Sequence, residues 1–114
     1  MFINKDDFKV FLYLGKIDMR KAINGLSLTV QDELKENIFG ENLFVFCNKN
    51  KTRIKILYWD KTGFCLWYKR LEKDKFKWPR STEQAMSISK EELLWLLKGL
   101  DFRSAHKELS YKEI

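Results

Sequence analysis

Residues 55–71 have the pattern of a β-hairpin, and no other segment restricts the fold of this chain as strongly. Two runs rich in β-branched and aromatic residues flank the polar turn 60–63. Asp60 at the first turn position can accept a backbone N–H, and Gly63 at the fourth position tolerates a positive φ. With residues 61–63 as a three-residue loop, the pattern predicts that Asp60 pairs with Phe64.

This register sorts the hairpin side chains onto two faces, because successive residues of a strand point to opposite sides of a sheet. The face expected to join the core carries Ile54, Ile56, Tyr58, Phe64, Leu66 and Tyr68. The other face carries cations and large side chains: Arg53, Lys55, Leu57, Trp59, Cys65, Trp67 and Lys69. Lys55 and Lys69 then lie opposite each other and repel, which an anionic partner would relieve. Alternatively, the tryptophans and Leu57 lie beneath a helix while the lysine ammonium groups reach water.

Positive charge is concentrated in the middle of the chain. Residues 47–80 contain 11 lysines and arginines but three acids, a net charge of +8, whereas the whole chain carries +6. Such a local field attracts polyanions, although it can also serve solubility alone. The cations assigned to a nucleic-acid site are Arg20, Lys21, Lys49, Lys51, Arg53, Lys55, Lys69, Arg70, Lys73, Lys75, Lys77 and Arg80.

The strand pattern predicts an α+β fold with a single antiparallel sheet of about five strands and two helices. Besides the hairpin, strands are expected at residues 8–14, 43–47, 76–79 and 86–88. The hairpin is expected at the centre of the sheet, with the first helix on one face. One domain is expected over residues 1–102, followed by a charged, frayed tail at 103–114.

The first helix is expected over residues 19–37, with Asp18 as its N-cap and an apolar stripe at helical spacing. Arg20 and Lys21 in its first turn oppose the helix dipole, which favours acids there. Either Asp18 pairs with Arg20, or the two cations and the free N–H groups together hold a phosphate.

The second helix is expected from Ser89 to Lys98. Ser89 and Glu92 form a capping box, and Gly99 is suited to the residue just beyond the C-terminus. Leu94 and Trp95 broaden its apolar surface beyond one stripe. They are assigned to docking a partner, with a deep seat on the sheet as the alternative.

Seven segments together carry a family likeness that covers about residues 10–102: Asp18-Met19-Arg20-Lys21, Gly25-Leu26, Leu43–Phe46, Lys55–Asp60, Gly63–Glu72, Phe76–Pro79 and Leu93–Phe102. The chain resembles the TnpB-type (Orf2-like) accessory proteins of bacterial insertion-sequence family sixty-six. Ala22 departs from the pattern, since glycine is expected there. The resemblance implies a role in transposition beside a separate DDE-type transposase, and it supplies no catalytic residues.

The sequence shows no catalytic constellation. Its carboxylates are scattered, whereas a metal-dependent transposase needs several that converge on two cations. Cys47 and Cys65 form neither a zinc set nor a disulfide framework and are expected to be reduced, and the single histidine, His106, has no evident nucleophile beside it. No enzymatic activity, cofactor or metal is therefore expected.

Three functions remain open at this point. The first is a DNA-binding accessory factor that engages the element ends or the transposition complex. The second is a module that docks on the transposase or a sister accessory protein through residues 93–97. The third is an RNA-binding regulator, because basic strands interleaved with Trp59 and Trp67 suit stacking on unpaired bases. No long apolar run or signal-peptide core is present, so a cytoplasmic location without a membrane partner is expected.

Overall fold

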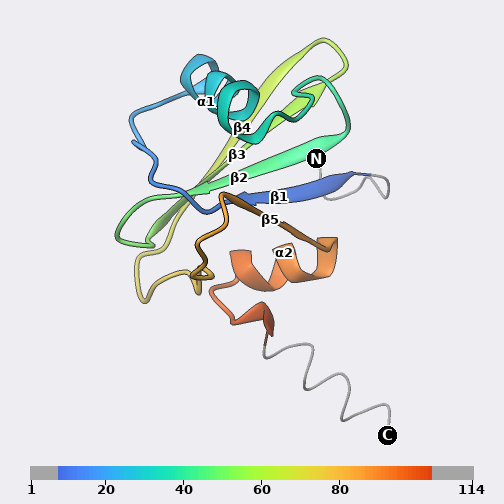
Figure 1. Cartoon of the computed structure of the whole chain (residues 1–114). Helices are drawn as coiled ribbons and strands as arrows, with labels where there is room; N and C mark the ends of the chain where they lie inside the picture. Colours follow the sequence, from blue (N-terminus) through green and yellow to red (C-terminus); the bar gives the residue numbers. More distant parts are fainter. Residues whose placement is uncertain (1–7, 104–114) are drawn as a thin grey trace, which may run out of the picture.

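The computed structural model describes residues 8–103 and contains one five-stranded sheet with a helix on each face (Figure 1). The strands are β1 (Lys9–Tyr13), β2 (Asn42–Cys47), β3 (Arg53–Asp60), β4 (Gly63–Arg70) and β5 (Ala85–Ile88). The helical elements are α1 (Ile23–Thr29), the π-helical turn η2 (Val30–Leu34) and α2 (Lys90–Leu97). The predicted α+β class is confirmed. His106 and nearly all of the expected tail lie outside the described residues.

The sheet has the strand order β4-β3-β2-β1-β5 and is mixed, not wholly antiparallel as predicted. β1 and β2 are parallel because the chain crosses over through α1 between them, and all other neighbours are antiparallel. The β3–β4 hairpin therefore lies at one edge of the sheet, and its predicted central position is wrong. The central strand is β2.

The predicted hairpin register is also wrong, by one residue. Asp60 pairs with Gly63, so the loop contains Lys61 and Thr62 alone. Lys61 adopts the left-handed φ of 47°, and Gly63, which was expected to supply a positive φ, does not. Because the side-chain period of a strand is two, this slip exchanges the two faces of β4 relative to β3.

Two apolar cores result, one on each face of the sheet. The first core lies beneath α2 and contains Val10, Leu12, Leu43, Val45, Cys47, Ile54, Ile56, Phe76, Ile88, Leu93, Leu96, Leu97 and Phe102. The second core lies beneath α1 and contains Tyr13, Leu26, Val30, Ile38, Phe44, Phe46 and Leu57. β2 contributes alternate residues to both cores, which explains its unbroken apolar sequence.

The first helix is shorter than predicted. It begins at Ile23, and its N-cap, Ala22, makes no side-chain capping hydrogen bond. Asp18 does not cap it, because its carboxylate accepts hydrogen bonds from the backbone N–H and the guanidinium of Arg20. The expected pairing of Asp18 with Arg20 is thus confirmed. The helical segment ends before Lys35, which has a left-handed φ of 56°.

The second helix forms as the sequence indicates. Ser89 and Glu92 make both hydrogen bonds of the capping box. Gly99 has a φ of 81°, its N–H donates to the Leu96 carbonyl, and the Leu100 N–H donates to Trp95. These two bonds define a Schellman motif, which satisfies carbonyls left free at the helix end.

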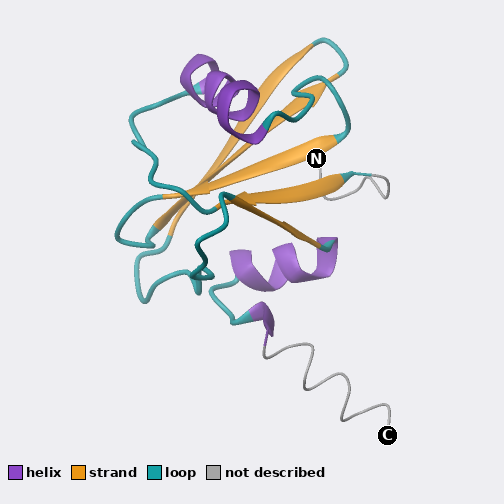
Figure 2. Ribbon diagram, viewed as in Figure 1, coloured by secondary structure: helices purple, strands orange, loops and turns teal. Residues whose placement is uncertain are grey.

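Residues 71–84 connect β4 to β5 as a long loop, drawn in teal in Figure 2. The strand predicted at 76–79 is absent. Phe76 is 2% exposed and belongs to the first core, and its N–H donates to the Lys51 carbonyl over 2.7 Å. A buried aromatic side chain, not a strand ladder, holds this loop against the sheet. Among the described helices, none is long and apolar enough to cross a membrane.

Candidate nucleic-acid interface

Cationic side chains collect at the end of the sheet where the parallel strands β1 and β2 terminate. The loop after β2 lies beside the 71–84 loop, because Phe76 donates to the carbonyl of Lys51 and Leu71 donates to that of Thr52. Three hollows at this end share lining residues. We define the cationic rim as the six cations that line them outside the chain terminus: Lys16, Lys49, Lys51, Lys75, Lys77 and Arg80.

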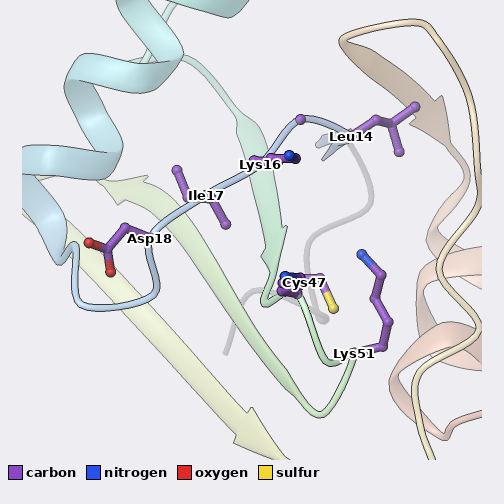
Figure 3. A pocket seen from close by; sticks show the side chains of 8 residues that line it. Leu14, Lys16, Ile17, Asp18, Cys47 and Lys51 are labelled. Carbon is purple, nitrogen blue, oxygen red and sulfur yellow. The ribbon is translucent and has the colours of Figure 1, made fainter.

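The hollow between the β1 and β2 loops is shown in Figure 3 and has a volume of about 510 Å³. Leu14 and Lys51 also line a second hollow of about 510 Å³ under the 71–84 loop. That hollow shares residues 77–80 with a third, of about 340 Å³, which also contains Asp101 and Arg103. The shared linings join three separate loops into one surface.

The charge of the cationic rim is not neutralised by described ion pairs. The salt bridges described near this end are Arg20–Asp18 at 2.7 Å and Arg70–Glu72 at 2.9 Å, and neither involves a rim residue. In Figure 3 the Asp18 carboxylate lies on the far side of its hollow from Lys51. An uncompensated set of cations on a concave surface attracts anions.

Lys55 and Lys69, predicted as a repelling pair on a basic sheet face, lie on opposite faces of the sheet. Lys55 is paired with Tyr68, and Lys69 is paired with Ile54. The ammonium of Lys55 donates to the backbone carbonyls of Met19 at 2.7 Å and Lys21 at 2.9 Å. The predicted like-charge pair is therefore wrong, and it resulted from the one-residue error in the hairpin register.

The Lys69 ammonium donates to the carbonyl of Leu97 at 2.7 Å, at the C-terminus of α2. A cation there is favourable because the last carbonyls of a helix carry partial negative charge. Lys55 and Lys69 therefore bind the protein's own backbone. Since a helix also covers each face of the sheet, positive charge is presented at the sheet end.

The other predicted cations lie either next to the cationic rim or near the start of α1. Arg53 and Arg70 are exposed and form the last cross-strand pair of the hairpin, next to the rim, with Lys73 in the following turn. Arg20 is held by Asp18 as described above. The Lys21 ammonium lies 3.5 Å from the Thr29 hydroxyl on α1. Lys16 belongs to the rim but was not predicted, although its place directly after the first strand was a usable signal.

The two tryptophans predicted for stacking and the two docking residues lie away from the rim, whereas Trp78 lines two of its hollows. Trp67 packs against the first core, and so does Trp95. Trp59 forms edge contacts with Phe39 at 5.1 Å and Phe64 at 4.9 Å, near the turn of the hairpin. Leu94 is half-buried. Much of the broad apolar surface of α2 is thus used in its seat on the sheet.

Chemistry-bearing side chains are sparse in the part of the chain that the structure describes. Within residues 8–103, no three His, Cys, Asp or Glu side chains gather where they could hold a metal ion. Cys47 and Cys65 are both free thiols. Cys47 lines the hollow of Figure 3 and is 5% exposed.

Burial raises the pKa of Cys47 to about 12, against a smaller lowering effect of the Lys51 charge. We expect the Cys47 thiol in a Cys65→Ser variant to react with Ellman's reagent at pH 8 at least tenfold more slowly in folded than in urea-unfolded protein, because only the thiolate reacts. The pKa of Cys47 in the folded protein lies above its ordinary value of 9.0, so the unfolded chain loses this proton first as the pH rises. The contribution of the Cys47 thiol to the free energy of unfolding is therefore complete below pH 9 and is lost from pH 9 to 12. Equal rates in folded and unfolded protein would contradict this burial.

The fold and the rim together describe a small α+β protein with a cationic end and, within the described residues, no assembled metal centre. Residues 8–107 match the family described as IS66 Orf2 like protein, and the chain belongs to that family. The resemblance seen in the sequence is thereby confirmed. The family implies an accessory role associated with an insertion sequence.

Two relatives come from Sinorhizobium fredii (strain NBRC 101917 / NGR234). The chain is 39% identical over 95 residues to "Uncharacterized protein y4hO", and the alignment covers 83% of each of the two chains. It is 36% identical over 94 residues to "Uncharacterized protein y4jC", which covers 82% of this chain and 80% of the relative. No solved structure gives a significant match.

Proposed function

We propose that the protein is a non-catalytic accessory factor for transposition of a bacterial insertion sequence and that it binds DNA through the cationic rim. The observation that carries this proposal is the convergence of six cations from three loops on adjoining hollows, without an ion-pair partner among the described residues. DNA presents closely spaced phosphates, and cations that neutralise them release condensed counterions.

The arrangement suits backbone recognition more than reading of bases. The rim lies on loops, and the two tryptophans of the hairpin lie in apolar contacts elsewhere. Trp78 lines two of the hollows, but it is half-buried and packs against the first core. Phosphate contacts position a protein on a duplex without sequence information. The rim would therefore contribute affinity and placement, and selection of the element ends would come from other parts of the transposition complex.

Binding is measured by fluorescence anisotropy against element-end duplex, unrelated duplex, single-stranded DNA and RNA, over a series of salt concentrations. If about four phosphates are neutralised, the log–log slope of affinity against salt should be about −3 to −4 on duplex DNA. Stronger binding to RNA than to duplex would favour the RNA-binding alternative. Absence of nucleic-acid binding near physiological salt would favour the docking module.

Removing two rim charges should change this slope. We expect Lys49→Gln with Lys77→Gln to flatten it by about two, because each lost phosphate contact contributes about 0.9. The matched control is Lys9→Gln with Lys61→Asn, which removes the same charge at the opposite end of the sheet. Asparagine suits the left-handed φ of Lys61. Equal flattening in both double variants would reject the rim and indicate a general charge effect.

A further inference from the structure

The two edges of the sheet differ in how they are protected against pairing with another chain. β5 is an edge of four residues, whereas β4 is an edge of eight, with a continuous register to β3 and no proline. Proteins usually shorten, bulge or interrupt an edge strand, because its free N–H and C=O groups can accept a further strand. β4 shows none of these three devices, and its charged residues, Lys69 and Arg70, occupy its last two positions.

The hydrogen-bond pattern identifies which residues of β4 direct their backbone groups outward. The Leu71 N–H donates to the Thr52 carbonyl over 2.8 Å and continues the β3–β4 ladder. Antiparallel pairs alternate between hydrogen-bonded and non-hydrogen-bonded positions. The odd-numbered residues of β4 therefore bond to β3, and the backbone groups of Phe64, Leu66, Tyr68 and Arg70 point away from the sheet.

We propose that β4 pairs with β4 of a second copy of this chain, antiparallel, about a two-fold axis at Leu66. A two-fold axis perpendicular to the sheet places one residue opposite its own copy, either an outward-directed residue as a hydrogen-bonded pair or an odd-numbered residue as a non-hydrogen-bonded pair. An axis at Cys65 would set Lys69 opposite the partner's Lys61, and an axis at Trp67 would set Phe64 opposite the partner's Arg70 and lose both aromatic pairs. With Leu66 at the axis, Phe64 lies opposite the partner's Tyr68, and the whole strand is paired. An axis at Phe64 would run into the turn at residues 61–62, and an axis at Tyr68 would leave Phe64 unpaired.

The side chains of this register are compatible with a copy of themselves. Lys69 lies opposite the partner's Gly63, and Arg70 lies opposite the partner's Thr62, so no like charges face each other. Phe64, Leu66 and Tyr68 share the α1 face of the sheet, where they form two aromatic pairs around a central leucine pair. Aromatic cross-strand pairs are among the favourable ones.

The register also accounts for two exposed aromatic side chains. Tyr68 is 48% exposed and Phe39 is 56% exposed. The Phe39 ring centroid lies 5.6 Å from that of Phe64, so a tyrosine opposite Phe64 reaches the Phe39 cluster. Pairing through β4 covers Tyr68 and joins it to these rings, a burial that a single chain does not achieve.

Site-directed crosslinking tests the axis in a Cys65→Ser background, with the native Cys47 buried. Directly opposite residues of a hydrogen-bonded antiparallel pair have Cα atoms about 5.5 Å apart, within disulfide range. Leu66→Cys should therefore form a disulfide-linked dimer under mild oxidation. Phe64→Cys and Tyr68→Cys should each crosslink poorly alone but should crosslink when mixed. The matched control on the other edge, Ser87→Cys, should remain unlinked.

Sedimentation equilibrium tests the dimer itself. Wild-type protein at tens of micromolar should have twice the mass of one chain. Tyr68→Glu should raise the dissociation constant at least tenfold, because it places a carboxylate opposite the partner's Phe64. The folded chain should tolerate this change, since Lys55 lies directly across the hairpin from residue 68. A monomer at these concentrations, or equal crosslinking of all single-cysteine variants, would overturn the proposal.

Discussion

Phe76→Ala is expected to lower the free energy of unfolding by about 3–5 kcal/mol, although Phe76 lies in a loop. Its side chain is 2% exposed and packs in the first core beneath α2. Truncation removes this buried ring and leaves a cavity. Because Phe76 also holds the loop that carries Lys75 and Lys77, the variant should also weaken the proposed binding of DNA by the rim, even where it remains folded.

Urea denaturation followed by tryptophan fluorescence measures this loss. The control is Lys77→Ala, an exposed neighbour whose change should alter stability by less than about 0.5 kcal/mol. A loss below about 1 kcal/mol for Phe76→Ala would show that the 71–84 loop does not depend on this anchor.

Replacing Lys55 and Lys69 together with methionine is expected to lower the free energy of unfolding by about 2–4 kcal/mol. The like-charge pair predicted from the sequence leads to the opposite expectation for stability, because removing a repulsion should preserve or raise the free energy of unfolding. In the structure, each ammonium donates to backbone carbonyls that would otherwise lose their partner. Methionine retains much of the apolar stem, so the loss reports the hydrogen bonds.

The two lysines lie on opposite faces of the sheet, so their single effects should add in the double variant. Thermal and urea denaturation of both single variants and the double variant measure this sum. The matched control is Lys49→Met with Lys77→Met, which removes the same charge from two rim positions whose ammonium groups donate to no carbonyl among residues 8–103. A double variant of Lys55 and Lys69 that is as stable as wild type would contradict the carbonyl contacts.

Local chemistry in the sequence predicted several elements correctly. Ser89 and Glu92 identified the start of α2, and Gly99 identified its end, because capping requires particular side chains at fixed spacing. The hairpin was located because β-branched and aromatic runs on either side of a polar turn have few other solutions. These signals depend on neighbours in sequence, which a single chain displays directly.

The hairpin register was not determined by such signals. A loop of two residues and one of three both fit the turn between Asp60 and Gly63. Hydrophobic alternation usually decides between them, but residues 64–68 are all apolar or aromatic, so either register gives two acceptable faces. The parallel pairing of β1 with β2 was missed for a related reason, since it depends on contacts between distant segments.

The candidate site was predicted in part. The lysines at 49, 51, 75 and 77 and Arg80 are brought together as the local charge suggested. Lys55 and Lys69 were grouped with them through the register error, and Lys16 joins them only because β1 and β2 end side by side. A high density of cations in a sequence indicates a positive electrostatic field. Tertiary contacts decide which of these cations face solvent and which donate to the protein's own backbone.

The position of β1 between β2 and β5 has a consequence for the order of folding. β2, β3 and β4 form a local meander that can pair as soon as it is synthesised, whereas Val10 pairs with Leu43 on one side and with Ile88 on the other. Contacts between distant residues form slowly, because closing a long loop costs entropy before the contact is made. β1 is therefore synthesised well before β5, and it is enclosed on both sides only after β5 has been made.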